Sequence, residues 1–182
     1  MPTRLRITEE VLGGCWDALQ SRRADLAVGA SGDAPVGGGF ATQVLGRVDF
    51  VFAVAPHHPL AQVKEPLRSD DLAGYRVIAL ADTSRNLPSR SLGLQGRQEV
   101  LTVPSPHAKV AAQIAGIGIG YLPRKEAEPH LANGTLLEKS LDEPLPYCQL
   151  SLAWRSKERG KALNWFLERL ANMRFSGVHS SS

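Results

Sequence analysis

The chain has 182 residues, of which 43% are hydrophobic and 21% charged, so it is long enough to bury a core as one domain or two small ones. No apolar stretch approaches the roughly 18 residues that cross a bilayer, which excludes a membrane span. The first residues lack the apolar run and cleavage site of a secretory signal, which predicts a cytoplasmic protein. The net charge is only +3, and the two cysteines lie far apart in apolar runs, which favours buried thiols over a metal site or a disulfide scaffold.

The first third of the chain has the alternating pattern of an α/β protein. A strand, an amphipathic helix and a second strand are followed by a glycine-rich loop and two further strands, predicted at residues 4–9, 11–23, 25–29, 32–39, 40–45 and 50–55. A strand–helix–strand connection of this length is typical of a right-handed crossover between parallel strands. The unbroken run FVFAVA at 50–55 indicates a strand that is buried on both faces.

The same alternation continues to the end of the chain. We expect a short helix at 70–74, a strand at 77–80, a polar loop at 82–96, a strand at 100–103, a helix from 106, a strand ending at 123, a helix at 125–132, strands at 136–137 and 147–154, a helix at 162–170 and a polar tail at 176–182. Ser105 is predicted to cap the helix that begins at Pro106. Val110, Ala111, Ile114 and Ile117 would form the buried stripe of that helix.

This order of elements predicts two α/β units. The apolar strands at 50–55 and 150–154 read as a paired hinge, with residues 49–154 inserted as a middle lobe. The predicted domains are therefore residues 1–48 together with 155–175, residues 49–154, and the tail at 176–182.

Signatures of catalysis are missing from the sequence. None of the five histidines lies in a metal-binding pattern, and neither a nucleophile elbow nor a P-loop is present. The glycines at 116, 118 and 120 follow a helix and precede a strand, whereas a dinucleotide site requires the opposite order. We therefore expect no catalytic residue, no metal and no cofactor, and rank an enzyme as the third alternative.

The expected binding site is a cleft between the two lobes, because open α/β sheets bind small ligands where strand ends and helix N-termini meet. Hydroxyls and free amides at such places favour an anion by about 0.3 to 1 kcal/mol each, which points to a small carboxylate. An equally open interpretation is that these side chains only cap helices and turns. The candidate site residues lie in three loops: Ala30, Ser31, Asp82, Thr83, Ser84, Pro104 and Ser105.

Five segments, taken together and in this order, resemble the effector-binding (regulatory) domain of LysR-type transcriptional regulators. They are RRADLAVG at 22–29, VFAVAPHHPLA at 51–61, AGIGIGYLP at 115–123, LSLAWR at 150–155 and ALNWFL at 162–167. The resemblance covers about residues 3–172. Each segment alone is mostly apolar, but five of them in register indicate the family.

The resemblance implies an α/β fold that is periplasmic-binding-protein-like, with two α/β subdomains joined by two crossover strands. It implies a non-enzymatic domain that binds a small organic effector, expected to be anionic, and that forms a homodimer or higher oligomer without a membrane partner. Operator DNA would be bound only through an N-terminal helix-turn-helix, which this chain is expected to lack.

The family's domain also begins with one more strand and helix before the strand matching residues 4–9, so the first subdomain is expected to lack them. By resemblance, part of the effector site lies in that missing stretch, which leaves the three loops named above. The alternative is a free-standing small-molecule binding protein of the same fold.

Overall fold

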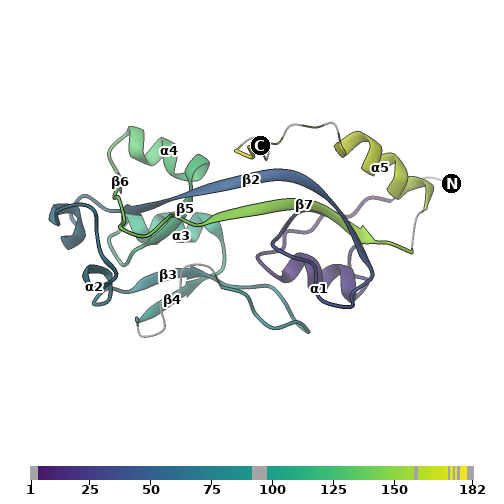
Figure 1. Ribbon diagram of the computed structural model, residues 1–182, viewed down its shortest axis with the longest axis horizontal. Helices are drawn as coiled ribbons and strands as arrows, with labels where there is room; N and C mark the ends of the chain where they lie inside the picture. Colours follow the sequence, from purple (N-terminus) through teal and green to yellow (C-terminus); the bar gives the residue numbers. More distant parts are fainter. Residues whose placement is uncertain are drawn as a thin grey trace. The chain divides into compact units, whose positions relative to one another are not determined.

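The computed structural model describes residues 4–91, 98–157, 160–171, 173, 175 and 177–179. Its elements, in chain order, are α1 (Gly14–Gln20), β1 (Leu26–Ser31), β2 (Phe40–Val54), the 3-10 helix η1 (Pro59–Gln62), α2 (Ser69–Leu72), β3 (Val77–Leu80), β4 (Val100–Val103), α3 (Pro106–Ile114), β5 (Gly120–Pro123), α4 (Arg124–Ala132), β6 (Leu137–Glu138), β7 (Tyr147–Arg155) and α5 (Lys161–Ala171) (Figure 1). Among these helices, none has both the length and the apolar character that spanning a membrane requires.

The chain divides into two compact units. Unit 1 comprises Met1–Arg47, Asp82–Arg90 and Cys148–Ser182, and unit 2 comprises Val48–Ala81 and Ser91–Tyr147. Two of the four boundaries fall inside the long strands β2 and β7, and the other two enclose residues 82–90. The limits expected from the sequence differ from this division because they assign residues 82–90 and 148–154 to the middle lobe.

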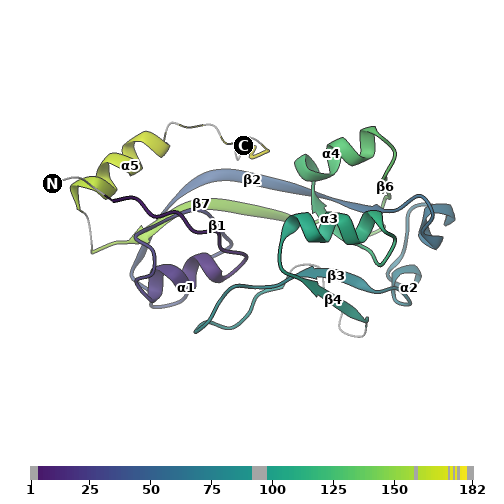
Figure 2. The same cartoon turned by 180° about the vertical axis from the view of Figure 1, so that it is seen from behind.

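The core of unit 1 forms around α1. Trp16 and Leu19 are fully buried and pack against Ala27, Ala30 and Ala153, small residues that leave room for the two large side chains. Strand β1 pairs antiparallel with β7, and β7 in turn pairs with β2. Figure 2 shows α1 beside β1, and the indole Nε1 of Trp16 donates a hydrogen bond to the carbonyl at the end of β1, 2.9 Å away.

The core of unit 2 lies on both faces of the second half of β2, which pairs antiparallel with β5 and β6. Val51 and Ala53 pack on one face with residues of β5 and of the helices α3 and α4. Phe52 and Val54 pack on the other face with residues of η1, α2 and β3. All four side chains are at most 2% exposed, so the predicted strand buried on both faces is confirmed. Strands β3 and β4 form a separate parallel pair, against which α3 also packs.

Three local expectations were wrong. Residues 4–9 form no strand, because no described strand lies beside this segment to share its backbone hydrogen bonds. The side chains of Leu5 and Ile7 in this segment are 64% and 84% exposed. The strands expected at 40–45 and 50–55 are one continuous strand, β2. The third error concerns α3, of whose predicted stripe Val110 is buried and Ile114 packs against the core, whereas Ala111 and Ile117 are exposed.

The helix α3 buries Lys109, Val110, Ala112 and Gln113. Ile117, by contrast, is 45% exposed and lies beyond the end of the helix. Of the predicted polar tail only residues 177–179 are described, and residues 92–96 of the predicted loop lie outside the described part.

A substitution of Gly118, which lies between α3 and β5, can test how closely unit 2 is packed. A Cβ atom at this position would overlap the carbonyl oxygen of Arg76 and come within 2.8 Å of Ile78 Cδ1. We expect Gly118→Ala to lower the free energy of unfolding by about 1 to 3 kcal/mol, because the backbone of β3 must shift. Gly74→Ala is the matched control, since nothing lies within 4 Å of a Cβ there. Urea unfolding of both variants measures the difference, and equal stabilities would contradict this description.

Candidate functional site

The first candidate loop, at the end of β1, is part of the structure of unit 1. Ala30 is fully buried in the core around α1. The hydroxyl of Ser31 donates a 3.3 Å hydrogen bond to the carbonyl of Leu12. The carbonyl of Ser31 accepts from Trp16 Nε1 and from Arg90 Nη1, both at 2.9 Å. These polar groups therefore already have partners inside the unit.

Thr83 joins the second candidate loop to the turn before α1. Its Oγ1 accepts a hydrogen bond from the backbone N–H of Val11 at 2.9 Å and donates to Glu10 Oε2 at 2.6 Å. The backbone N–H of Thr83 also donates to the carbonyl of Val11 at 3.3 Å. A Cβ atom at Gly14 would overlap the Thr83 hydroxyl, so a glycine is needed where these segments meet. The only hydroxyl proton of Thr83 is used inside the unit.

Asp82 makes a second set of contacts with the same turn. Its Oδ2 accepts from the N–H groups of Gly13 at 3.1 Å and Arg90 at 2.6 Å, and its Oδ1 accepts from the N–H of Ser84 at 2.7 Å. Burial raises the pKa of the Asp82 carboxyl, but the hydrogen bonds from Ser84, Arg90 and Gly13 outweigh it and hold that pKa below its ordinary value. Asp82 therefore carries a stable negative charge in this loop.

A third carboxylate, Asp17 on α1, holds the far part of the same loop. It is fully buried and lies 2.8 Å from Arg23 Nη2. Its Oδ1 accepts from the backbone N–H groups of Asn86 at 2.7 Å and Leu87 at 3.1 Å. Burial raises the pKa of the Asp17 carboxyl, but the hydrogen bonds from Arg23 and the backbone amides lower this pKa by more, to about 2. These contacts explain why residues 82–90 belong to unit 1.

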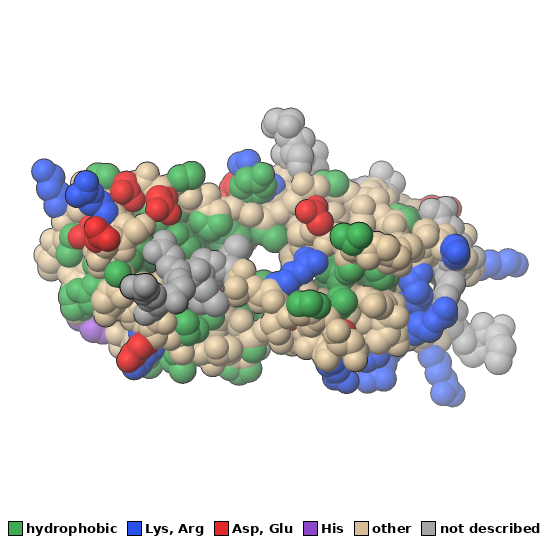
Figure 3. Space-filling model, turned by 60° about the horizontal axis from the view of Figure 1, so that its bottom comes forward, with side chains coloured by type: hydrophobic (Ala, Val, Ile, Leu, Met, Phe, Trp, Pro, Cys, Tyr) green, Lys and Arg blue, Asp and Glu red, His purple; other side chains and the backbone are tan. Residues whose placement is uncertain are grey.

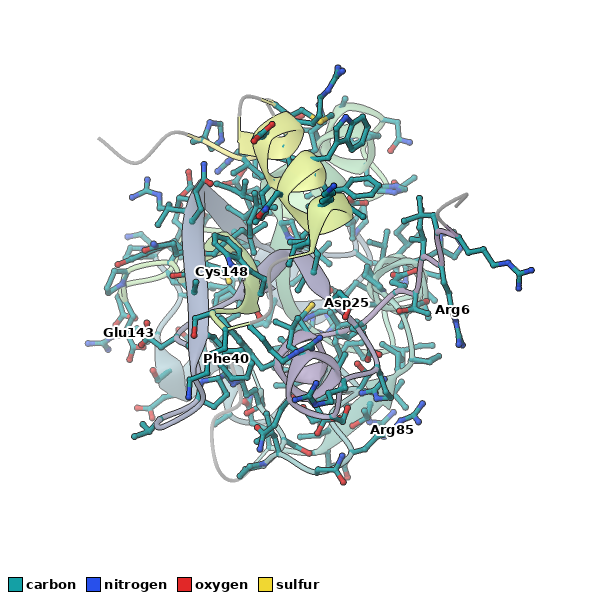
Figure 4. The ribbon with its side chains drawn as sticks, turned by 90° about the vertical axis from the view of Figure 1, so that its right-hand side faces the viewer. Arg6, Asp25, Phe40, Arg85, Glu143 and Cys148 are labelled. Atoms are coloured by element: carbon teal, nitrogen blue, oxygen red, sulfur yellow. The ribbon has the colours of Figure 1, made fainter. Side chains whose placement is uncertain are left out.

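Arg23 and Arg90 help to hold this loop, whereas other exposed arginines of unit 1 do not. Arg6 and Arg85 point outward in Figure 4, and neither makes an ion pair with another described residue. Lys and Arg outnumber Asp and Glu in the sequence of unit 1, and their side chains gather over this part of the surface in Figure 3. The loop is therefore fixed by the carboxylates of Asp17 and Asp82 together with Arg23 and Arg90, whereas Arg6 and Arg85 stay on the surface.

The third candidate loop belongs to unit 2, where Ser105 caps α3 as the sequence predicts. Its backbone is extended, and its Oγ accepts from the N–H of Ala108 at 3.2 Å, with Pro106 at the start of the helix. The hydroxyl proton of Ser105 and the N–H of His107 have no acceptor within the described ranges. Pro104 is exposed. This helix end therefore offers hydrogen-bond donors and the positive end of the helix dipole.

The sequence analysis missed two polar residues that follow Ser105 on the same face of α3. Lys109 is only 6% exposed and Gln113 is fully buried. Burial lowers the pKa of the Lys109 ammonium to about 8. Their spacing of four residues places them on one helix face with Ser105, which is the signal that the sequence offered.

Preformed cavities in unit 2 are small. One of about 20 Å³ lies among Phe52, Leu72, Val77, Gln98, Ile119, Gly120 and Tyr121, and this volume suits a single water and no organic molecule. No group of three metal-ligating side chains occurs in the part of the chain that the structure describes.

Comparison with known proteins gives one family and a consistent set of relatives. Residues 3–174 match the family described as the LysR substrate binding domain. The chain is 40% identical over 181 residues to the uncharacterized HTH-type transcriptional regulator YeeY of Escherichia coli, a match that covers 99% of this chain and 59% of YeeY. The chain thus spans less than two thirds of the length of this relative.

Solved structures give the same result for the fold. The regulatory domain of MetR, a LysR family regulator from Neisseria meningitidis, is 21% identical, with a TM-score of 0.65 over 91% of this chain and 77% of that domain. The effector binding domain of QuiR in complex with shikimate is also 21% identical, with a TM-score of 0.62 over 85% of this chain and 73% of QuiR's. The predicted periplasmic-binding-protein-like fold class is therefore confirmed.

Replacement of the buried carboxylate of Asp17 should uncouple the loop from α1. We expect Asp17→Asn to lower the free energy of unfolding at pH 7 by about 3 kcal/mol, because a neutral amide cannot accept all three hydrogen bonds or pair with Arg23. The folded pKa of about 2 lies below the ordinary 3.8, so the stability from this charge is present above about pH 4 and is lost as the pH falls through 2. Urea unfolding at several pH values should show that the free energy of unfolding falls at low pH in the parent, and that it falls less in the variant.

Asp25→Asn is the matched control for this measurement. Asp25 also pairs with an arginine, Arg155, at 2.7 Å, but its side chain is 86% exposed, so its removal should cost at most about 1 kcal/mol. Equal losses in the two variants would show that the buried carboxylate does not hold the loop.

Proposed function

Since the chain belongs to the LysR substrate-binding domain family, we propose that it is the effector-sensing domain of a LysR-type transcriptional regulator. Binding of a small organic effector would modulate DNA-dependent transcription in the intact protein. Operator DNA would be bound only through a helix-turn-helix (HTH) domain, which the name of YeeY, an HTH-type regulator, indicates for that relative. On this proposal the domain is a non-enzymatic sensor that acts in the cytoplasm as a homodimer or higher oligomer. Units 1 and 2 would correspond to the two subdomains of the family.

The observation that carries the proposal is the capped N-terminus of α3. Ser105 keeps a hydroxyl proton to donate, and the adjacent amide of His107 adds a second donor at the positive end of the helix dipole. Such an arrangement stabilises a carboxylate or another anion. The bound shikimate of QuiR, a carboxylate, supports the same chemical class of effector for a domain of this fold.

The candidate loops of unit 1 have a different role, which lies inside unit 1 itself. Thr83 and Ser31 have already donated their hydroxyl protons to Glu10 and Leu12, so these side chains shape the loop more than they bind an anion. The carboxylates of Asp82 and Glu10 repel an anion by like charge. We therefore assign the anionic group of the effector to Pro104 and Ser105, and to Ala30, Ser31, Asp82, Thr83 and Ser84 a role in shaping the loops of unit 1.

Two substitutions of Ser105 separate effector binding from helix capping. Ser105→Ala removes both the cap and the donor, and should lower stability by about 1 kcal/mol and effector affinity roughly ten- to a hundredfold. Ser105→Asp keeps a good cap but places a negative charge against the effector, so stability should hold while affinity for a carboxylate falls at least about tenfold. A panel of small carboxylates that includes shikimate identifies a ligand by thermal shift, and calorimetric titration then gives the affinities.

Thr135→Ala serves as the control, since Thr135 makes its hydrogen bonds in a turn of the same unit, far along the chain from α3. Its affinity for the carboxylate should equal that of the parent. If Ser105→Asp binds the ligand as tightly as the parent does, Ser105 only caps the helix and the proposed site is wrong.

A further inference from the structure

Residues 82–90 belong to unit 1 by their contacts but to unit 2 by chain connection. Ala81 and Ser91, the residues on either side of this segment, are both part of unit 2. The covalent links between the two units are the strands β2 and β7, inside which the other two boundaries lie. Residues 82–90, which we call the latch, are therefore held in unit 1 by non-covalent contacts alone.

The latch is closed at its base into a single piece. The carboxylate of Asp82, the first residue of the latch, accepts from the backbone N–H of Arg90, the last residue, at 2.6 Å. The same carboxylate accepts from the N–H of Ser84 at 2.7 Å. All residues of the latch are described, and none of them lies in a helix or strand. Asp82 therefore ties the two ends of the latch together by charge-assisted hydrogen bonds that stay within it.

Three sets of polar contacts anchor the latch to the rest of unit 1. Near its start, the backbone N–H of Val11 donates to Thr83 Oγ1 at 2.9 Å, and the N–H of Thr83 donates to the carbonyl of Val11 at 3.3 Å. In its middle, the N–H groups of residues 86 and 87 donate to the buried carboxylate of Asp17 on α1 at 2.7 and 3.1 Å. At its end, the guanidinium of Arg90 donates to two backbone carbonyls at and just after the end of β1, both at 2.9 Å.

Apolar burial contributes less than these polar contacts to holding the latch. Leu87 is partly buried and packs against the core around α1. Arg85, Asn86, Pro88 and Ser89 are exposed. Segments with few buried apolar contacts and no regular secondary structure open at a lower free energy than the core of the same protein. The latch therefore combines a closed internal structure with a weaker attachment than the strands of either unit have.

We propose that the latch detaches from unit 1 as one piece while both units stay folded, and that it thereby controls how freely the two units move. The docked latch ties the chain that follows β3 to α1, which adds a third connection to those through β2 and β7. The detached latch is a surface loop of unit 2, and β2 and β7 then join the units covalently without it. Such a segment with a docked and a detached state is a conformational switch. This inference goes beyond the proposed function because the switch operates without an effector.

Hydrogen exchange of the ¹⁵N-labelled chain, followed by NMR without any ligand, tests the proposal. The latch amides are those of Thr83, Asn86 and Leu87, and the reference amides are the hydrogen-bonded ones in the ladders between β1 and β7 and between β2 and β5. The three latch amides should share one protection factor, at least about tenfold below those of the reference amides. Low concentrations of urea should change the exchange of the latch amides less, because detachment exposes less surface than unfolding does. The same protection and the same urea dependence for both sets would overturn the proposal, since the latch would then open only when the chain unfolds.

Asp17→Asn removes the middle anchor and tests whether the latch detaches as one piece. All three latch amides should lose protection together, including that of Thr83, which bonds to Val11 and not to Asp17, while the reference amides stay protected. Asp25→Asn is the matched control and should leave the protection of the latch amides unchanged, because the exposed Asp25 pairs with an arginine outside the latch. Loss of protection at residues 86 and 87 alone would refute detachment as one piece. If Asp17→Asn unfolds the whole chain, the urea series of the parent decides by itself.

Discussion

The buried carboxylate of Asp17 is the constraint on which unit 1 depends. Its charge is compensated by Arg23 and by the backbone N–H groups of residues 86 and 87, so that a segment distant in sequence is held against α1. Asp82 adds the same kind of contact at the other end of the segment, where it accepts from Gly13. Hydrogen bonds to a carboxylate are about twice as strong as those between neutral groups, and burial keeps solvent from competing for them. The chain consequently leaves unit 2 after Ala81 and returns to it at Ser91.

The face of α3 that begins at Ser105 has the opposite electrostatic character. In unit 1 the buried charge of Asp17 already has its hydrogen-bond partners, whereas the hydroxyl of Ser105 and the N–H of His107 at the start of α3 have no acceptor among the described residues. The first arrangement stabilises a loop, and the second is available to a ligand. This contrast is why we assign recognition of the effector's anionic group to α3.

The sequence predicted those features that depend on residues close together in the chain, and it missed contacts between distant residues. Ser105 and Pro106 form a capping signal that is complete within four residues, and the run at 50–55 requires burial on both faces, so both were predicted correctly. The contacts of Asp17 and Thr83 join residues about 70 positions apart in the chain, and no local sequence pattern predicts them. In the sequence Lys109 and Gln113 resemble the solvent face of an amphipathic helix, and the close approach of Lys109 to Gly120 becomes visible only in the structure. Residues 4–9 have the composition of a strand but no described neighbour to pair with, so propensity alone misled.

The central claim is that the effector is recognised by its negative charge. Native mass spectrometry of the chain with pairs of small carboxylates and their neutral primary amides tests it most directly, because each pair has nearly the same shape. The account predicts that at least one small carboxylate is retained while its amide is not. Equal retention of the amide would contradict the account, since the N-terminal end of α3 would then not be contributing through charge.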